Sequence, residues 1–71
     1  MRRLYYIEFT LDDYETDPPY LMQSQTFISK DDAKNWFYDN FDYVAMNADL
    51  MVMNFKDDSD EYEIDMVCRL N

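Results

Sequence analysis

The sequence contains no glycine and no histidine, and only one cysteine and two prolines among 71 residues. Phosphate-binding loops depend on glycine, so the absence of glycine excludes glycine-rich nucleotide-binding sites. Zinc sites are usually built from Cys and His ligands, and one cysteine without histidine cannot supply a tetrahedral set. Without glycine, tight turns must use Asn, Asp, Ser or Pro, and this requirement accounts for some of the aspartates.

The lone cysteine, Cys68, cannot form an intramolecular disulfide. Small domains of oxidising compartments usually carry several disulfides, so we expect a reducing cytoplasm. No stretch approaches the roughly 20 apolar residues of a membrane span. The N-terminal apolar run is interrupted by Glu8 and lacks a small-residue cleavage site. We therefore expect a cytoplasmic protein, in the host cytoplasm if a phage encodes it, with no membrane partner.

Basic residues are scarce, because six Lys and Arg stand against sixteen Asp and Glu, for a formal charge of -10. Such a charge repels nucleic acid and attracts basic surfaces. The apolar fraction of 48% and the thirteen aromatic residues are sufficient for a compact core. We expect a single acidic domain over residues 1–71 that binds a basic protein surface, such as that of a nucleic-acid-binding protein, and does not bind nucleic acid directly.

Alternating apolar residues predict strands in both halves of the chain. The first strand is expected over Leu4–Leu11, and a second over Tyr20–Ile28, after a loop that contains Pro18 and Pro19. Leu50–Phe55 is predicted as a buried strand, with residues 43–48 as a turn or short extension. In the last strand, one face is expected to carry Tyr62, Ile64, Met66, Cys68 and Leu70, and the other Glu61, Glu63, Asp65 and Arg69.

One amphipathic helix is predicted to begin after Ser29, which resembles the first residue of a capping box with Asp32. Its apolar stripe comprises Ala33, Trp36, Phe37, Asn40 and Phe41, and its polar face comprises Asp31, Asn35, Tyr38 and Asp39. The expected order is β-β-α-β-β. It predicts an α+β fold in which a small antiparallel sheet of about four strands carries one helix on one face.

The segment "KDDSDEYEID", residues 56–65, contains six carboxylates. A calcium loop beginning at Asp57 would need glycine at its sixth position and glutamate at its twelfth, where Tyr62 and Cys68 stand. A weak divalent-ion cluster stays open as an alternative. Carboxylates in loops and on outward strand positions stay ionised, and Cys68 has no histidine to activate it. We expect neither an enzyme nor a cofactor, and no specific metal site.

The acidic surface itself is the remaining candidate for function. Self-repulsion at -10 opposes folding of a small domain, and Asp39 and Asp42 lie where a helix C-terminus disfavours negative charge. Glu61, Glu63 and Asp65 would repeat at about 6.8 Å along a strand, close to two nucleotide steps of DNA. The predicted partner-binding residues are Asp57, Asp58, Asp60, Glu61, Glu63, Asp65, Asp31, Tyr38, Asp39 and Asp42. Tyr6, Tyr14 and Tyr38 are expected to be exposed beside them.

In size, charge and compactness the chain resembles the small acidic proteins, including anti-CRISPR and anti-restriction proteins, with which phages and mobile elements inhibit host nucleic-acid-binding machinery. The resemblance implies an inhibitor that mimics nucleic acid. The alternative is an acidic interaction or assembly module without mimicry. A homodimer is also expected, because Met51, Met53 and Phe55 would make a second apolar sheet face that one helix cannot cover. A loop over residues 12–19 could shield that face instead.

Overall fold

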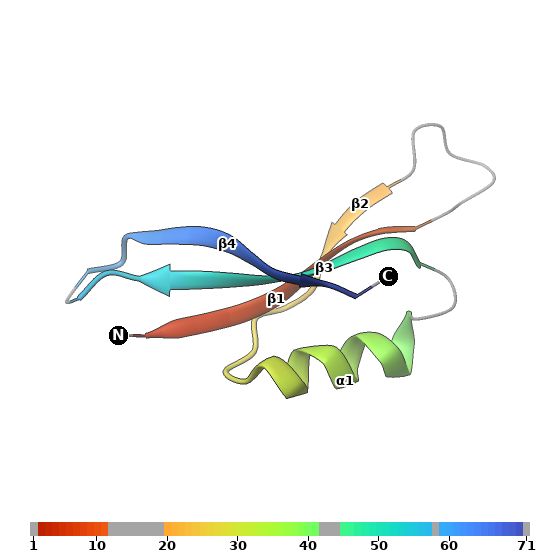
Figure 1. Ribbon diagram of the computed structural model, residues 1–71, viewed down its shortest axis with the longest axis horizontal. Helices are drawn as coiled ribbons and strands as arrows, with labels where there is room; N and C mark the ends of the chain where they lie inside the picture. The colour runs from red at the N-terminus through yellow and green to blue at the C-terminus, as the bar shows by residue number, and fades with distance from the viewer. Residues whose placement is uncertain (1, 12–19, 42–44, 58, 71) are drawn as a thin grey trace.

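The computed structural model describes residues 2–11, 20–41, 45–57 and 59–70. Its elements are, in chain order, β1 (Arg3–Leu11), β2 (Tyr20–Gln23), α1 (Lys30–Asn40), β3 (Ala45–Phe55) and β4 (Tyr62–Arg69). The strands form one antiparallel sheet in the order β2-β1-β3-β4, and α1 packs against β1 and β3 on one face (Figure 1). The predicted α+β fold and element order are confirmed.

The core lies between α1 and the two central strands. Ile7 and Phe9 of β1 face α1 because they alternate with outward residues, and Leu50 of β3 pairs with Ile7 on the same face. The core residues are all at most 2% exposed: Ile7, Phe9, Ala33, Phe37, Ala48 and Leu50. Leu50 and Val52 point to α1 while Met51 and Met53 point away, as the alternation predicts.

Ser29 starts the helix as predicted. Its backbone is extended, and its Oγ accepts a hydrogen bond of 3.1 Å from the backbone N–H of Asp32. Phe37 is fully buried, and Trp36 is half-buried against the rings of Phe9, Phe27 and Phe41. The assignment of Asn40 to the apolar stripe was wrong. Its side chain is exposed and donates to the Trp36 carbonyl at 2.7 Å.

β2 ends at Gln23, well before the predicted Ile28, because Ser24 interrupts the ladder. The Ser24 N–H donates to the Ile7 carbonyl, but the Ile7 N–H donates to the Ser24 Oγ, each at 2.8 Å. The Ser24 Oγ thus accepts the hydrogen bond that a backbone carbonyl of the neighbouring strand would accept in a regular ladder. The chain meets β1 once more, in an isolated bridge between Tyr5 and Phe27.

β3 begins at Ala45, so the predicted turn or extension is strand from that residue onward, and residues 43 and 44 lie outside the described chain. β4 contains a bulge, because Met51 pairs with Met66 and Leu50 pairs with Cys68, which leaves Val67 unpaired. The bulge reverses the alternation. Cys68 therefore faces α1, whereas Met66 faces away, and the single-face assignment of the last strand was wrong.

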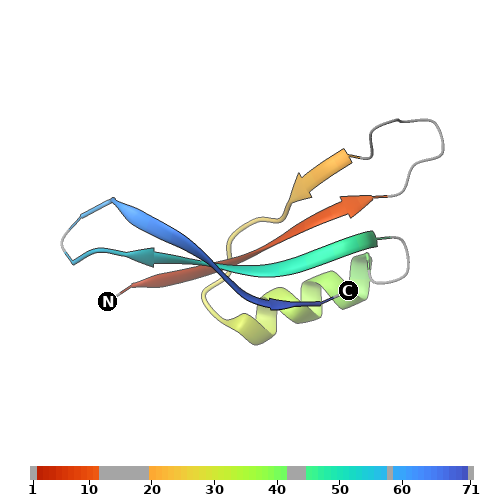
Figure 2. The ribbon, with the colours of Figure 1, turned by 45° about the horizontal axis from the view of Figure 1, so that its top comes forward.

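One end of the sheet extends beyond the helix, as Figures 1 and 2 show. This end, which we call the arm, consists of residues 2–4, 53–57 and 59–65 from β1, β3, β4 and the turn that joins β3 to β4. α1 covers the other half of the sheet, where the core residues lie. The principal-axis extents are 45 × 23 × 17 Å, and the arm lies at one end of the long axis (Figure 1).

Candidate functional site

Five of the predicted site residues lie together on the arm. Asp57, Asp60 and Glu61 belong to the turn between β3 and β4, and Glu63 and Asp65 belong to β4. All five side chains are exposed, and we call this group the acidic edge. Asp58, which was predicted with them, lies outside the described residues.

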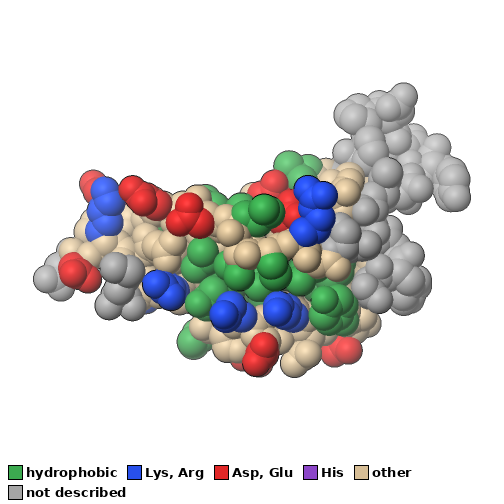
Figure 3. Space-filling model, viewed as in Figure 1, with side chains coloured by type: hydrophobic (Ala, Val, Ile, Leu, Met, Phe, Trp, Pro, Cys, Tyr) green, Lys and Arg blue, Asp and Glu red, His purple; other side chains and the backbone are tan. Residues whose placement is uncertain are grey.

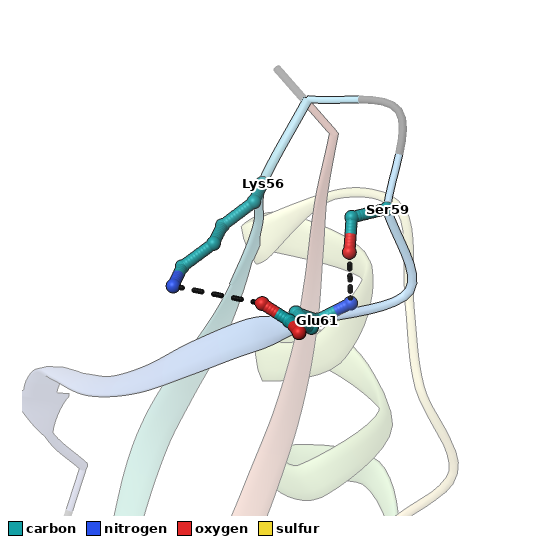
Figure 4. A network of polar contacts seen from close by, with 3 residues as sticks. All are labelled: Lys56, Ser59 and Glu61. Atoms are coloured by element: carbon teal, nitrogen blue, oxygen red, sulfur yellow. Dashed lines mark hydrogen bonds and ion pairs between the residues drawn. The ribbon is translucent and has the colours of Figure 1, made fainter.

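The turn is held by polar contacts that do not need glycine (Figure 4). The Lys56 N–H donates to the Glu61 carbonyl at 2.9 Å, and the Glu61 N–H donates to the Ser59 Oγ at 2.9 Å. Lys56 Nζ lies 3.8 Å from a Glu61 carboxylate oxygen, with both side chains more than half exposed. An ion pair this exposed contributes at most about 1 kcal/mol, so Glu61 remains available to a stronger cationic partner.

Glu63 and Asp65 share one face of β4, on the side of the sheet where α1 lies. Glu63 pairs with Asn54 and Asp65 pairs with Val52, and the Asn54 Nδ2 donates to the Asp65 Oδ2 at 3.1 Å. No Lys or Arg in the described part of the chain forms an ion pair with either carboxylate. The predicted row is therefore formed by these two strand residues, while Glu61 precedes the strand.

Arg69 was expected on the face of Glu63 and Asp65, but the bulge at Val67 places it on the opposite face. There its Nε lies 3.6 Å from the Asp49 Oδ1, which is buried. This distance makes an ion pair but is too long for a hydrogen bond. Because Asp49 also stands directly opposite Glu8 of β1, Arg69 offsets an unfavourable pair of like charges. The bulge thus removes a cation from the acidic face.

The second group of predicted residues lies on α1. Asp31, Tyr38 and Asp39 are exposed on its outer face, as expected. α1 packs chiefly on β1 and β3, over the half of the sheet away from the arm (Figure 1). The structure therefore separates this group from the acidic edge. Asp42 and Tyr14 lie outside the described chain.

The sheet face opposite α1 carries a continuous apolar surface, which we call the open face. It comprises Leu4, Tyr6, Met51, Met53, Phe55, Tyr62, Ile64 and Met66. Tyr62, Ile64 and Met66 are 46%, 48% and 57% exposed. Sequence alternation identified the β3 members, but assigned the β4 members to the same side as Cys68, because nothing in the sequence marks the bulge.

Tyr6 was expected to be an exposed anchor, but its side chain is only 6% exposed. It lines a groove of about 320 Å³ on the open face together with Gln23, Ser24, Thr26, Met53, Tyr62 and Ile64. Burial raises the pKa of the Tyr6 hydroxyl, with smaller contributions from Glu8 and Tyr62. The phenol therefore remains neutral around neutral pH and acts as part of the apolar surface.

Charges of opposite sign are unevenly distributed over the surface. In Figure 3, acidic side chains follow one another on the β4 side of the molecule, with basic side chains near both ends of the row. Further basic side chains gather over β1 and α1 in the same view. The acidic edge is thus a local feature, and not the uniform surface that net charge alone suggests.

Beyond the acidic edge and the open face, the described part of the chain carries one thiol and several dispersed carboxylates. No cluster of three or more His, Cys, Asp or Glu in this part is placed to hold a metal ion. Cys68 is a free, half-buried thiol packed against the core. No helix among the described residues has the length and apolar character needed to cross a membrane. Comparison with protein-family models, curated proteins and solved structures found no match.

Proposed function

We propose that this protein is a non-enzymatic inhibitor, of the kind that phages and mobile elements use, and that its acidic edge occupies the basic nucleic-acid-binding site of another protein. The observation that carries the proposal is the pair Glu63 and Asp65, which are exposed on one face of a strand and, among the described residues, form no ion pair with Lys or Arg. Asp57 and Asp60 extend the negative charge to the tip of the arm.

The spacing of the strand carboxylates supports the proposal. Two residues along an antiparallel strand advance by about 6.8 Å. This distance is similar to the rise of two nucleotide steps along one strand of B-DNA. A groove whose Lys and Arg side chains are arranged for phosphates can therefore meet Glu63 and Asp65 without rearrangement. Shape also favours this use, because the arm extends beyond α1 and can approach a concave target (Figure 2).

The test compares two variants with equal changes of charge. The edge variant carries Glu61→Gln, Glu63→Gln and Asp65→Asn, and the control carries Asp31→Asn, Asp32→Asn and Asp39→Asn on α1. Each is immobilised, exposed to a bacterial lysate and eluted first with duplex DNA and then with salt. We expect wild type and the α1 control to capture basic nucleic-acid-binding proteins that duplex DNA releases, and the edge variant to capture none of them.

Two results would contradict the proposal. Captured proteins that resist both DNA and salt would show that the contact is not at a nucleic-acid site, since screening weakens exposed charge pairs. If the α1 control lost capture while the edge variant retained it, the binding surface would lie at Asp31 and Asp39 and not at the acidic edge. Circular dichroism of both variants checks that folding is unchanged.

The open face favours a second candidate, an assembly module. Exposed Tyr62, Ile64 and Met66 adjoin Met51 and Met53, and contiguous apolar surfaces of this kind often mark protein contacts. Methionine adapts well to a partner surface. In this case the acidity serves solubility, and two copies associate through their open faces.

A further inference from the structure

Among the described residues, β4 has a neighbouring strand on one side only. It is the last strand of the sheet and, within the described residues, pairs only with β3. All its residues except Cys68 are exposed. An edge strand presents unpaired N–H and C=O groups that can pair with another extended chain. Natural edge strands are often short, and β2 at the other edge has four residues, but β4 has eight.

The two faces of β4 differ in chemistry over the stretch before the bulge. Glu63 and Asp65 lie on the α1 side, and Tyr62, Ile64 and Met66 lie on the open face. A strand added beside β4 would place its own alternate side chains on the same two faces. To match β4, its side chains would have to be cationic on the α1 side of the sheet and apolar on the open face.

A second copy of the chain does not meet this requirement. Symmetric antiparallel pairing of two β4 strands centred on residue 63, 64 or 65 places a carboxylate directly opposite another carboxylate. Like charges at directly opposite positions destabilise a sheet. A register centred on Met66 would place Glu63 opposite Arg69 of the second copy, but the bulge turns these two side chains to different faces.

We propose that β4 binds an extended, Lys- and Arg-rich segment of its partner protein as a fifth strand of the sheet. The segment alternates cationic residues, opposite Glu63 and Asp65, with apolar residues beside Ile64 and Met66. Directly opposite side chains have Cβ atoms about 4.5–5.5 Å apart, within reach of an ion pair. The inference rests on the proposed function, which supplies the basic partner, and adds the backbone pairing by which it is held.

Capped nine-residue peptides of arginine and valine provide the probe. The first peptide alternates arginine and valine, and the second has the same composition in two blocks. The third and fourth are alternating peptides in which either all arginine amides or all valine amides are N-methylated. Successive residues of a strand point their amides to opposite edges, so methylating every arginine or every valine amide blocks one edge only. We expect the alternating peptide to bind more tightly than the block peptide, and only one methylated version to bind.

Hydrogen exchange and variants complete the test. Binding of the alternating peptide should slow amide exchange in β4, and Glu63→Gln with Asp65→Asn should lower its affinity by roughly tenfold. The variant Glu8→Gln with Asp32→Asn, which removes the same charge from residues outside the predicted partner-binding set, should leave the affinity unchanged. All titrations are repeated at two salt concentrations.

Three outcomes overturn the inference. Equal, salt-sensitive binding of both methylated peptides, lost in the Glu63→Gln, Asp65→Asn variant, would show attraction by charge without strand pairing and would leave the proposed function intact. Peptide affinity unaffected by that variant would count against both. Protection of β4 amides in the free protein that rises with its concentration would show that a second copy occupies the edge.

Discussion

Replacing Phe37 with alanine tests the packing that holds the sheet to α1. The Phe37 side chain is fully buried and meets the ring of Phe9 at a centroid distance of 5.9 Å. Truncating a buried phenylalanine costs about 3–5 kcal/mol. A chain of 71 residues has a free energy of unfolding of about 4–11 kcal/mol. We therefore expect Phe37→Ala to remove a large part of the stability and to lower the melting temperature by more than about 12 °C.

The single tryptophan makes the measurement direct. Trp36 is half-buried beside Phe9, Phe27 and Phe41, so its fluorescence reports unfolding in denaturant. Tyr38→Ala is the matched control, because Tyr38 is on the same helix but 45% exposed, and it should cost less than about 1 kcal/mol. A loss below about 1 kcal/mol in Phe37→Ala, or equal losses in both variants, would refute the described helix packing.

Three further predictions concern the cap, the open face and the buried phenol. Ser29→Ala should cost about 1 kcal/mol in chemical denaturation, whereas Ser29→Asp should retain most of the stability, since both Ser and Asp accept the Asp32 N–H. Sedimentation equilibrium should show a mass that rises with added salt, because screening weakens repulsion between two acidic chains; a monomer at low and high salt would exclude dimers through the open face. Stability should fall as pH rises above about 10, because the unfolded chain loses the Tyr6 proton first, and Tyr6→Phe should reduce this slope.

The fold was predictable because local patterns and packing agree in most of the chain. The alternation in β1, the Ser29 cap and the placement of Leu50 and Val52 toward the helix are all confirmed. The early end of β2 was not predictable, because it depends on one hydroxyl, that of Ser24, replacing a backbone acceptor. Apolar Phe27 and Ile28 follow further along the chain and extend the predicted strand, although Ile28 is 84% exposed in the structure.

The position of the acidic residues near a turn was predictable, but their arrangement was not. Acidic residues near a turn are readable from the sequence, and Asp57, Asp60 and Glu61 are found there. Which strand lies at the sheet edge depends on topology, since β1 pairs with both β2 and β3 and leaves β4 outermost. The bulge at Val67 is likewise a tertiary feature, and it decides which side chains accompany Glu63.

The central position of β1 and β3 has a consequence for the kinetics of folding. These two strands are not neighbours in sequence, because β2 and α1, the helix that covers them, lie between them. The helix and the two hairpins can form from local contacts, but the core requires closure of the long loop between Ile7 and Leu50. We expect changes at this pair to slow folding, whereas changes in β4 mainly speed unfolding. β4, which carries Glu63 and Asp65, can thus vary in sequence with little effect on the rate at which the domain folds.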